Sequence, residues 1–371
     1  MKVTHVITPI NYGGGENLII NLVEKMDKSV ENEVLNLSYS EEFEKHLDKN
    51  KITHGKISDK NLGASPSKKK YLFFLISILF QVFFTKSKIK GQIIHAHGFP
   101  ANIFIALMKK LGLLRGKKLI FTSHSEKKSE KALVRKFYLF FLKEFDVISA
   151  VGEKSFVSMK SIFPELSNKL IKINNGIKVE NFYYKEKDSE LKNKLALKDE
   201  DIVAIYVSRL SSVKNHKFLL DLMSKINMKN FKLLIVGEGE EKESLLSLRE
   251  KLQLEDRVIF QGFVKNEDLV NYYSLANMVL FPSSSEGFGI SMVEAIACRK
   301  ALVLFENIYF EELEDSVLRA KNEEEFIEHT KKLINSEEYR QTLGFKGEKI
   351  REKLSIENCA KNYEKLYRSL L

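Results

Sequence analysis

Residues 278–297, MVLFPSSSEGFGISMVEAIA, join a short apolar run to a second apolar segment through a loop of serines and glycines. Met278–Phe281 has the length and composition of a buried strand, and Gly287–Ala297 repeats apolar residues at helical spacing. A strand that leads through such a loop into a helix is one half of a βαβ unit. The loop is therefore expected at the carboxyl end of a strand, where open α/β sheets bind their ligands.

The same alternation of strand and helix continues in both directions along the chain. Further apolar runs of strand length are Val3–Thr8, Glu33–Leu37, Gln92–Ala96, Lys118–Thr122, Asp146–Val151, Leu170–Ile173, Ile202–Val207, Lys232–Val236, Val258–Phe260 and Ala301–Leu304. Segments with helical periodicity are Glu16–Met26, Ala101–Leu111, Glu153–Ile162, Asn215–Lys225, Glu240–Leu252 and Glu267–Leu275. Everything after Ala320 has a helical pattern. Two such series, separated by the polar segment Phe182–Asp201, predict an α/β protein with two doubly wound domains of parallel sheet.

Charge is distributed unevenly between the two halves. Residues 1–180 contain 30 Lys and Arg against 17 Asp and Glu, a net +13, whereas residues 181–371 contain 30 against 33, a net −3. Within residues 60–145 the balance is 18 basic against 3 acidic, a net +15. This asymmetry indicates an anionic partner, either a nucleic acid or the inner face of a membrane. The chain has no zinc-finger spacing and no aromatic RNA-binding strand motif, so we expect no nucleic acid partner.

Basic residues flank two very apolar helical segments of this region, Tyr71–Phe84 and Phe137–Leu142. The flanking residues are Lys68, Lys69, Lys70, Lys86, Lys88, Lys90, Lys131, Arg135, Lys136 and Lys143. Helices of this kind lie in a membrane interface, where each Lys or Arg contributes about 1 kcal/mol. We expect the 60–145 region to contact an anionic membrane surface. The alternative is two buried helices with solvated lysines at their ends.

Neither a spanning helix nor a secretion signal is predicted. The longest nearly apolar run, Tyr71–Phe84, has 14 residues, and a helix of that length spans about 21 Å, short of the ~30 Å hydrocarbon core. The N-terminal apolar stretch is short and runs into glycines. Cys298 and Cys359 lie far apart, which leaves no disulfide framework and no cysteine-based zinc site. We expect a cytoplasmic protein, peripheral on the inner face of the plasma membrane.

The loop after Phe281 carries one carboxylate, Glu286, and a second, Glu294, lies about two turns into the helix that follows. Backbone N–H groups near Phe288–Ser291, where the helix is expected to begin, can face a phosphate. Glu294 can accept two hydroxyls of a ribose, and Glu286 can accept hydroxyls of whatever the nucleotide carries. The alternative is a helix cap with ordinary surface acids.

A second loop, SRLSSVKN at 208–215, follows the expected strand Ile202–Val207. Arg209 and Lys214 lie five residues apart just past the carboxyl end of this strand. Two converging cations suit a diphosphate, because Arg can clamp its oxygens while Lys adds a point charge. The alternative is that both are incidental basic residues on a solvated loop.

Three further patterns carry less weight. Gly13–Gly15 either lets the backbone approach an anion at a helix N-terminus or forms a tight turn. His95 and His97 alternate at a strand end, but no third ligand is evident and we expect no metal there. Residues 199–201 form a D-x-D sequence that precedes a strand, and we expect a solvated acidic turn.

Together these segments resemble the retaining glycosyltransferases of family four, which have the GT-B fold. Glu286 and Glu294 match the family's E-x7-E motif, and VSRLSSVKNH at 207–216 matches its phosphate clamp. Further matching segments are Gly13–Glu16, Thr122–His124, Asn174–Ile177, Leu233–Gly239 and Phe260–Val264. The resemblance covers residues 1 to about 305 and implies two Rossmann-like domains that face a cleft. It implies an acceptor-binding domain over 1–183, a nucleotide-sugar-binding domain over 184–354, and a helix at 355–371 that returns to the first domain.

The resemblance also implies roles for individual residues. Arg209 and Lys214 would stabilise the departing diphosphate, and Glu286 would hold hydroxyls of the donor sugar. His124 is the candidate for touching the reacting centre. The other residues that it implies at the donor are Gly14 and Gly15 beside the sugar, Glu294 at the ribose, Gly237, Gly262 and Val264 beside the base, and Phe288, Gly289, Ile290 and Ser291 at the distal phosphate.

The implied reaction moves a hexose or N-acetylhexosamine, with retention, from a nucleotide-diphosphate sugar to a hydroxyl. We expect a UDP-sugar as donor, with GDP-mannose next, and a lipid-linked saccharide or oligosaccharide of surface polysaccharide synthesis as acceptor. No cofactor and no metal are expected. The alternatives are a non-catalytic glycosyltransferase-like binding subunit and a nucleotide-sugar epimerase of the same fold.

Two departures from the family pattern stand out. Arg299 and Lys300 occupy the place of its glycine and proline, where a positive φ would favour glycine over Arg. The glycine-rich stretch expected after Leu304 is shortened to FENIYFEELEDS. Neither change removes a charged residue of the motifs.

Overall fold

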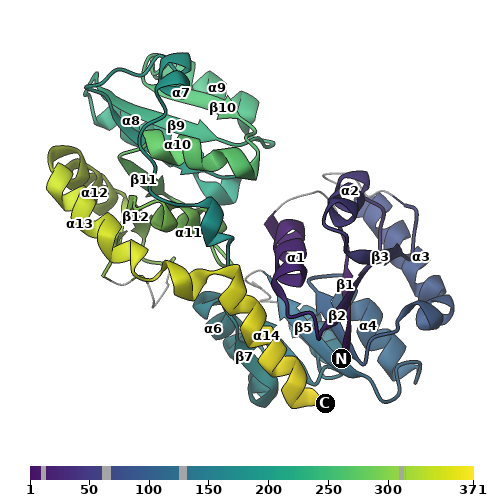
Figure 1. The fold of residues 1–371 in the computed structure, drawn as a ribbon. Coiled ribbons are helices and arrows are strands. Elements are labelled where there is room, and N and C mark those ends of the chain that lie inside the picture. The colour runs from purple at the N-terminus through teal and green to yellow at the C-terminus, as the bar shows by residue number, and fades with distance from the viewer. Residues whose placement is uncertain (10–13, 61–67, 125–131, 309–312, 314) are drawn as a thin grey trace. The chain divides into compact units, whose positions relative to one another are not determined.

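The computed structural model describes residues 1–9, 14–60, 68–124, 132–308, 313 and 315–371 (Figure 1). Contacts divide the chain into two compact units. The first unit is Met1–Ile177 with Ser355–Leu371, and the second is Lys178–Leu354. Each unit contains one parallel sheet with helices between its strands. The predicted α/β class with two Rossmann-like domains is therefore confirmed.

The first unit contains a seven-stranded sheet in the order β3-β2-β1-β4-β5-β6-β7. Its strands are β1 Lys2–Ile7, β2 Glu31–Asn36, β3 Thr53–Lys56, β4 Ile93–His97, β5 Lys118–Ser123, β6 Val147–Ala150 and β7 Leu170–Lys172. Its helices are α1 Gly14–Lys25, α2 Glu41–Lys49, α3 Lys68–Thr85, α4 Ala101–Lys110, α5 Ala132–Leu142, α6 Glu153–Ile162 and α14 Ile356–Leu370, with 3-10 turns η1 Lys86–Lys88 and η2 Pro164–Lys169. Strand β3 was not predicted from the sequence, because this edge strand, THGK, lacks large apolar residues.

The second unit contains a six-stranded sheet in the order β10-β9-β8-β11-β12-β13. Its strands are β8 Ile202–Val207, β9 Phe231–Val236, β10 Val258–Gly262, β11 Met278–Phe281, β12 Ala301–Phe305 and β13 Val317–Ala320. Its helices are α7 Ser189–Lys194, α8 His216–Lys225, α9 Lys242–Lys251, α10 Leu269–Leu275, α11 Ile290–Ala297, α12 Glu323–Asn335 and α13 Glu337–Glu348, with 3-10 turns η3 Val179–Asn181, η4 Ser212–Lys214, η5 Asn266–Asp268 and η7 Arg351–Leu354. Strand order reverses between β8 and β11, so the loops after these two strands flank a topological switch point.

The units divide after Ile177, earlier than the boundary expected at residue 183. The intervening residues pack within the second unit. Phe182 is fully buried, and its ring lies 6.2 Å from that of Tyr273 between centroids. Arg351 Nη2 also donates to the carbonyl of Val179 at 3.0 Å. Apolar burial and this hydrogen bond, and not the polar composition further along, set the boundary.

Helix α14 belongs to the first unit, because its apolar side packs with α1 and the sheet. Two buried tyrosines of this helix reach polar side chains of the strands. The Tyr367 hydroxyl lies 2.7 Å from His95 Nδ1, and the Tyr363 hydroxyl lies 2.9 Å from Ser149 Oγ. The chain enters α14 beside Gly176, where a Cβ would lie 2.3 Å from the Ser355 carbonyl oxygen. This close approach requires glycine at position 176.

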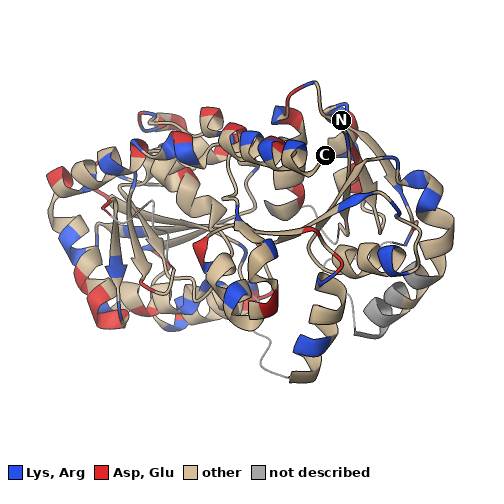
Figure 2. Ribbon diagram, turned by 90° about the horizontal axis from the view of Figure 1, so that it is seen from below, with Lys and Arg blue, Asp and Glu red and all other residues tan. Residues whose placement is uncertain are grey.

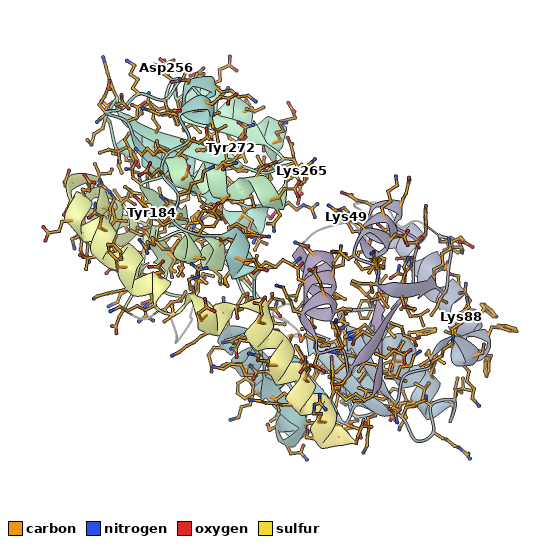
Figure 3. All side chains as sticks on the ribbon, viewed as in Figure 1. Lys49, Lys88, Tyr184, Asp256, Lys265 and Tyr272 are labelled. Carbon is orange, nitrogen blue, oxygen red and sulfur yellow. The ribbon has the colours of Figure 1, made fainter. Side chains whose placement is uncertain are left out.

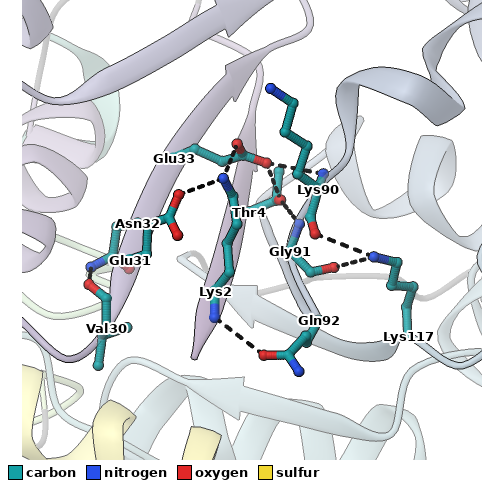
Figure 4. Close-up of polar contacts among 10 residues, drawn as sticks. All are labelled: Lys2, Thr4, Val30, Glu31, Asn32, Glu33, Lys90, Gly91, Gln92 and Lys117. Atoms are coloured by element: carbon teal, nitrogen blue, oxygen red, sulfur yellow. Dashed lines mark hydrogen bonds and ion pairs between the residues drawn. The ribbon is translucent and has the colours of Figure 1, made fainter.

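A polar cluster joins β1, β2 and the start of β4 (Figure 4). The Thr4 hydroxyl donates to Glu33 Oε1 at 2.5 Å and accepts from Gly91 N at 2.8 Å. Lys90 N donates to the same Glu33 oxygen at 3.1 Å. A Cβ on Gly91 would lie 2.5 Å from Thr4 N, so only glycine fits there. These bonds fix three adjacent strands at the end of the sheet opposite their carboxyl termini.

Removing one hydroxyl of α14 tests how strongly this helix is anchored. Tyr367→Phe keeps the ring but deprives the buried His95 Nδ1 of its partner, which costs about 1–3 kcal/mol. We expect the urea midpoint of unfolding to fall in proportion to that loss of free energy. Tyr339→Phe, on the exposed part of α13, is the control and should leave the midpoint unchanged. Equal midpoints for the Tyr367 variant and the unmodified protein would contradict the anchoring role.

Candidate functional site

Two loops of the second unit meet at the switch point between β8 and β11. Ser284 N donates to the Val213 carbonyl at 2.9 Å, and the Ser284 hydroxyl reaches the same oxygen at 3.1 Å. Asn307 Nδ2, from the loop after β12, donates to the Ser284 carbonyl at 2.7 Å. The loops after three neighbouring strands are thus joined directly at the carboxyl edge of the sheet.

An ion pair connects the two predicted motifs. Lys214 Nζ, at the end of η4, lies 2.5 Å from Glu286 Oε1, and their side chains are 25% and 9% exposed. The Ser283 hydroxyl donates to the same carboxylate oxygen at 2.7 Å. Ser283 Oγ lies 2.7 Å from the hydroxyl of Tyr206, whose pKa burial raises above its usual value. A buried chain of hydroxyls therefore holds Glu286 toward Lys214.

Arg209, the other predicted cation, pairs with a different carboxylate. Its guanidinium pairs with Glu240 Oε2 at 3.0 Å, and both side chains are more than half exposed. Such an exposed pair contributes little to stability, about 0–1 kcal/mol, so Arg209 can leave Glu240 for an anionic ligand at small cost. Lys214 and Arg209 thus pair with separate carboxylates.

Glu294 lies within α11 and is buried, with 4% of the residue exposed. The hydroxyl of Tyr273 lies 3.1 Å from Glu294 Oε2 and 3.1 Å from the Ser291 carbonyl. Burial raises the pKa of the Glu294 carboxyl to about 7. Figure 3 labels Tyr272, the chain neighbour of Tyr273 on α10. A carboxyl in this environment changes its protonation state near neutral pH.

Helix α11 begins at Ile290, three residues later than predicted, because Gly289 adopts a left-handed conformation with φ 75° and ψ 58°. Met292 N is bonded to the Gly289 carbonyl, so the N–H groups of Ile290 and Ser291 precede the helical ladder. Phe288 is buried just before the turn. The start of α11 therefore still has backbone N–H donors close in sequence to Glu286.

The glycines predicted to border a base have a packing role within the chain. A Cβ on Gly237 would lie 2.0 Å from the Ser208 carbonyl oxygen, and one on Gly239 would lie 2.2 Å from that of Leu210. Gly262 has φ 80°, and its carbonyl accepts a hydrogen bond from Gly237 N at 2.8 Å. The loop after β9 therefore supports the loop that carries Arg209. Val264 follows two residues after Gly262 and precedes Lys265, which Figure 3 labels.

In the first unit, His124 follows β5, and Gly14 and Gly15 begin α1. Gly13 lies outside the described residues. A Cβ on Gly15 would meet nothing within 4 Å, so none of its described neighbours requires glycine there. His124 Nε2 lies 3.4 Å from His97 Nδ1, and burial lowers the pKa of His124 to about 4.

The structure supplies a third histidine that was not recognised from the sequence, His5 on β1. One ligand atom from each of His5, His95 and His97 lies within 4.8 Å of the others, and all three are buried. All six of their ring nitrogens already have hydrogen-bond partners among Asn32, His97, His5, Tyr367, Thr122 and His124. A metal ion would have to displace several of these bonds, so the geometry fits a hydrogen-bonded cluster better.

The D-x-D sequence is only partly a solvated turn. Asp199 is exposed and pairs with Lys192. Asp201 is buried instead, and its Oδ2 accepts a hydrogen bond from Lys198 N at 2.8 Å. The carboxylates of this turn therefore serve local structure just before β8.

The first unit also exposes apolar side chains on α3 and α5, which both pack against α4. Their exposed apolar residues are Phe73, Ile76, Phe80, Phe83 and Phe84 on α3, and Leu133, Val134, Phe137 and Phe140 on α5. Exposed lysines lie close by, and Lys110 Nζ is 3.9 Å from the centre of the Phe140 ring. In the second unit, by contrast, both signs of charge are interspersed on the helices (Figure 2). Among the described residues, no helix is long and apolar enough to cross a membrane.

Comparison with known proteins finds a family match for each half of the chain. Residues 187–350 match the family "Glycosyl transferases group 1", and residues 12–181 match "Glycosyltransferase Family 4". Both halves of the chain thus match glycosyltransferase families, as the resemblance implied.

Named relatives agree with this assignment over part of their length. The α-monoglucosyldiacylglycerol synthase of Acholeplasma laidlawii is 28% identical over 209 residues, 54% of this chain and 52% of that protein. A Campylobacter jejuni N-acetylgalactosamine-N,N'-diacetylbacillosaminyl-diphospho-undecaprenol 4-alpha-N-acetylgalactosaminyltransferase is 35% identical over 129 residues, 35% of this chain and 33% of that protein. The matches thus span about half or less of each relative.

A solved structure shares the fold of this chain over its full length. Anabaena HepE, in complex with UDP-glucose, has a TM-score of 0.80, 18% identity, and complete coverage of both chains. At that identity the likeness concerns the fold alone.

The candidate site contains supporting residues that were not identified from the sequence. Tyr206 and Ser283 hold Glu286, Tyr273 faces Glu294, and Glu240 pairs with Arg209. Tyr206 is hard to recognise because it lies within an apolar strand and resembles an ordinary core residue. Arg299 does adopt φ 56°, the positive angle that its family position suggested.

Two glycine substitutions test whether packing within the chain requires glycine at position 239 but not at position 15. Gly239→Ala brings a Cβ within 2.2 Å of the Leu210 carbonyl, so the loop must move and the melting temperature should fall by several degrees. Gly15→Ala meets no described atom within 4 Å and should leave the melting temperature unchanged. Calorimetry of both variants beside the unmodified protein measures this difference. Equal shifts for the two would contradict the assignment of Gly239 to packing.

Proposed function

We propose that the chain is a metal-independent, retaining glycosyltransferase that moves a hexose or N-acetylhexosamine from a UDP-sugar to a hydroxyl of a lipid-linked saccharide. The observation that carries the proposal is the contact of Lys214 with Glu286, eight residues before Glu294, at the switch point of the second sheet. Cations for a diphosphate and carboxylates for sugar hydroxyls thus occupy one edge of one sheet. Anabaena HepE, which shares the fold and was solved with UDP-glucose bound, supports UDP as the nucleotide.

The charges of this site suit a departing diphosphate. In the proposed reaction Lys214 leaves Glu286 and binds a phosphate oxygen, while Arg209 leaves Glu240 and clamps another. Glu286 then accepts hydroxyls of the sugar. The N–H groups of Ile290 and Ser291, beside Phe288 and Gly289, face the distal phosphate. Cations held at that position stabilise the negative charge that develops as the sugar leaves.

The remaining predicted residues surround this centre in the proposal. Glu294 accepts the ribose hydroxyls, and the backbone near Gly237, Gly262 and Val264 borders the base. From the first unit, His124 and the α1 N-terminus at Gly14 and Gly15 approach the sugar.

Turnover with a panel of nucleotide sugars tests the proposal. Release of UDP from UDP-hexoses and UDP-N-acetylhexosamines, measured with EDTA present and with a membrane extract as acceptor, should exceed release from GDP-, ADP- and TDP-sugars. Glu286→Gln should lower the rate at least about a hundredfold, because it removes the charge that faces both the sugar and Lys214. Glu243→Gln, on the exposed part of α9, is the control. UDP binding without turnover by any donor would instead favour a non-catalytic binding subunit.

The pH dependence of donor binding tests the role of Glu294. A pKa of about 7 leaves this carboxyl mostly protonated at pH 6 and mostly ionised at pH 8. The ionised form accepts the ribose hydroxyls through stronger, charge-assisted bonds, so UDP-glucose should bind about tenfold more weakly at pH 6 than at pH 8. UDP-glucose is suitable because its diphosphate diester does not titrate in this range. Calorimetric titration of UDP-glucose into Glu294→Gln should show weak binding that does not change with pH. Equal affinity of the unmodified protein at pH 6 and pH 8 would contradict the role of Glu294.

A lipid-linked acceptor is supported by the surface of the first unit. Phenylalanines exposed on α3 and α5, with lysines beside them, suit an interface of anionic lipid. The names of two relatives also contain a diacylglycerol and a diphospho-undecaprenol. We propose that these two helices dock the enzyme on the inner face of the plasma membrane, beside its acceptor.

Vesicle binding tests the docking surface. Phe80 and Phe84 are 75% and 80% exposed, so Phe80→Ser with Phe84→Ser should remove apolar contact without disturbing the core. We expect co-sedimentation with phosphatidylglycerol vesicles to weaken at least about tenfold. Phe345→Ser, on α13 of the second unit, is the matched control and should bind like the unmodified protein. Equal binding by all three proteins would contradict the docking surface.

A further inference from the structure

A continuous row of hydrogen-bonded side chains runs through the first sheet to His124. His124 Nε2 lies 3.4 Å from His97 Nδ1, and His97 Nε2 lies 3.0 Å from His5 Nδ1. His5 Nε2 in turn lies 3.1 Å from Asn32 Oδ1. The strands β1, β2 and β4 and the end of β5 each supply one member of this row.

Asn32 fixes the direction of the first hydrogen bond. Its side-chain amide nitrogen donates to the Val30 carbonyl at 3.1 Å (Figure 4). The amide oxygen is thereby left to face His5 Nε2, which lies 3.1 Å away. An amide oxygen only accepts hydrogen bonds, so His5 must carry its proton on Nε2. This bond lies at the start of β2, distant in sequence from His124.

The three imidazoles are neutral, because burial lowers the pKa of His5 to about 4, of His124 to about 4, and of His97 well below its usual value. A neutral imidazole has one donor and one acceptor nitrogen. With its proton on Nε2, His5 accepts at Nδ1 from His97 Nε2–H. His97 therefore accepts at Nδ1, where the neighbouring donor is His124 Nε2–H. One amide orientation thus determines three tautomers.

We propose that Asn32, His5 and His97 are positioning residues that hold His124 in the Nε2-protonated tautomer, with its Nδ1 lone pair available to accept a substrate hydroxyl. The value of this to catalysis rests on the proposed function, in which His124 approaches the donor sugar. A neutral, correctly oriented acceptor binds a hydroxyl, whereas the opposite tautomer would present an N–H to it. The row also fixes the ring plane of His124 without adding a charge of its own beside the reacting centre.

His95 provides an internal control for this mechanism. Its ring lies 4.0 Å from that of His97 between centroids and is equally buried. Its nitrogens, however, face Tyr367 and Thr122 and take no part in the row. Replacing His95 therefore disturbs the same core without interrupting the path from Asn32 to His124.

Nitrogen NMR of the ¹⁵N-histidine-labelled full chain, without any donor, tests the tautomer directly. The His124 signals are assigned from their loss in His124→Asn. At pH 7.5 we expect a protonated Nε2 and an unprotonated Nδ1. His5→Phe should let both tautomers appear, because His97 Nε2 loses its acceptor. Asn32→Leu interrupts the row at the partly exposed start of β2 and should also let both tautomers appear. This variant keeps the test decisive if His5→Phe, which alters the core, folds poorly.

His95→Phe should leave the His124 signals unchanged. A protonated Nδ1 in the unmodified protein, or an equal shift in His95→Phe and Asn32→Leu, would overturn the proposal. Because no sugar donor is present, this result does not depend on whether the chain transfers sugar. Where turnover is measured, kcat/KM per folded molecule should fall about tenfold in Asn32→Leu and stay unchanged in His95→Phe, as expected for one weakened hydrogen bond to the substrate.

Discussion

The ion pair between Lys214 and Glu286 holds together the part of the molecule on which the proposed chemistry depends. It links the loop after β8 to the loop after β11, the two loops that a doubly wound sheet brings side by side at its switch point. With 25% and 9% of the side chains exposed, the pair is largely shielded from solvent, and removing one partner would leave a buried charge uncompensated. Tyr206 and Ser283 extend the contact into the core, so Glu286 is held by hydroxyls as well as by the lysine.

In the proposal, a donor competes with carboxylates of the chain for Lys214 and Arg209. Lys214 already faces Glu286, and Arg209 faces Glu240. In the proposal, the phosphates of the donor take the place of these carboxylates at the two cations, and Glu286 turns to the sugar hydroxyls. The exposed Arg209 pair is easily exchanged, whereas the shielded Lys214 pair is not.

Much of this arrangement was predictable from the sequence. Strand and helix periodicity indicated both sheets, since β8 and β11 are continuous apolar runs, and the motif spacing located Lys214, Glu286 and Glu294 at one edge. Strand β3 was missed because THGK contains no large apolar residue, and β13 was missed because VLRA is only four residues long and includes a charged residue. The start of α11 was misplaced because a left-handed glycine at 289 ends the loop later than periodicity indicates. The partners of the site residues, such as Tyr273, His5 and Glu240, come from distant segments, and no local pattern reveals such contacts.

The carboxyl edge of the second sheet is, in our central proposal, a nucleotide-diphosphate site. Isothermal titration of UDP into the unmodified protein and into Lys214→Met tests it most directly, because methionine keeps much of the length of the side chain and removes its charge. We predict one saturable UDP site per chain, weakened at least about tenfold in the variant by loss of a charge-assisted bond. Failure of the unmodified protein to bind UDP, or equal affinity in both proteins, would contradict the proposal.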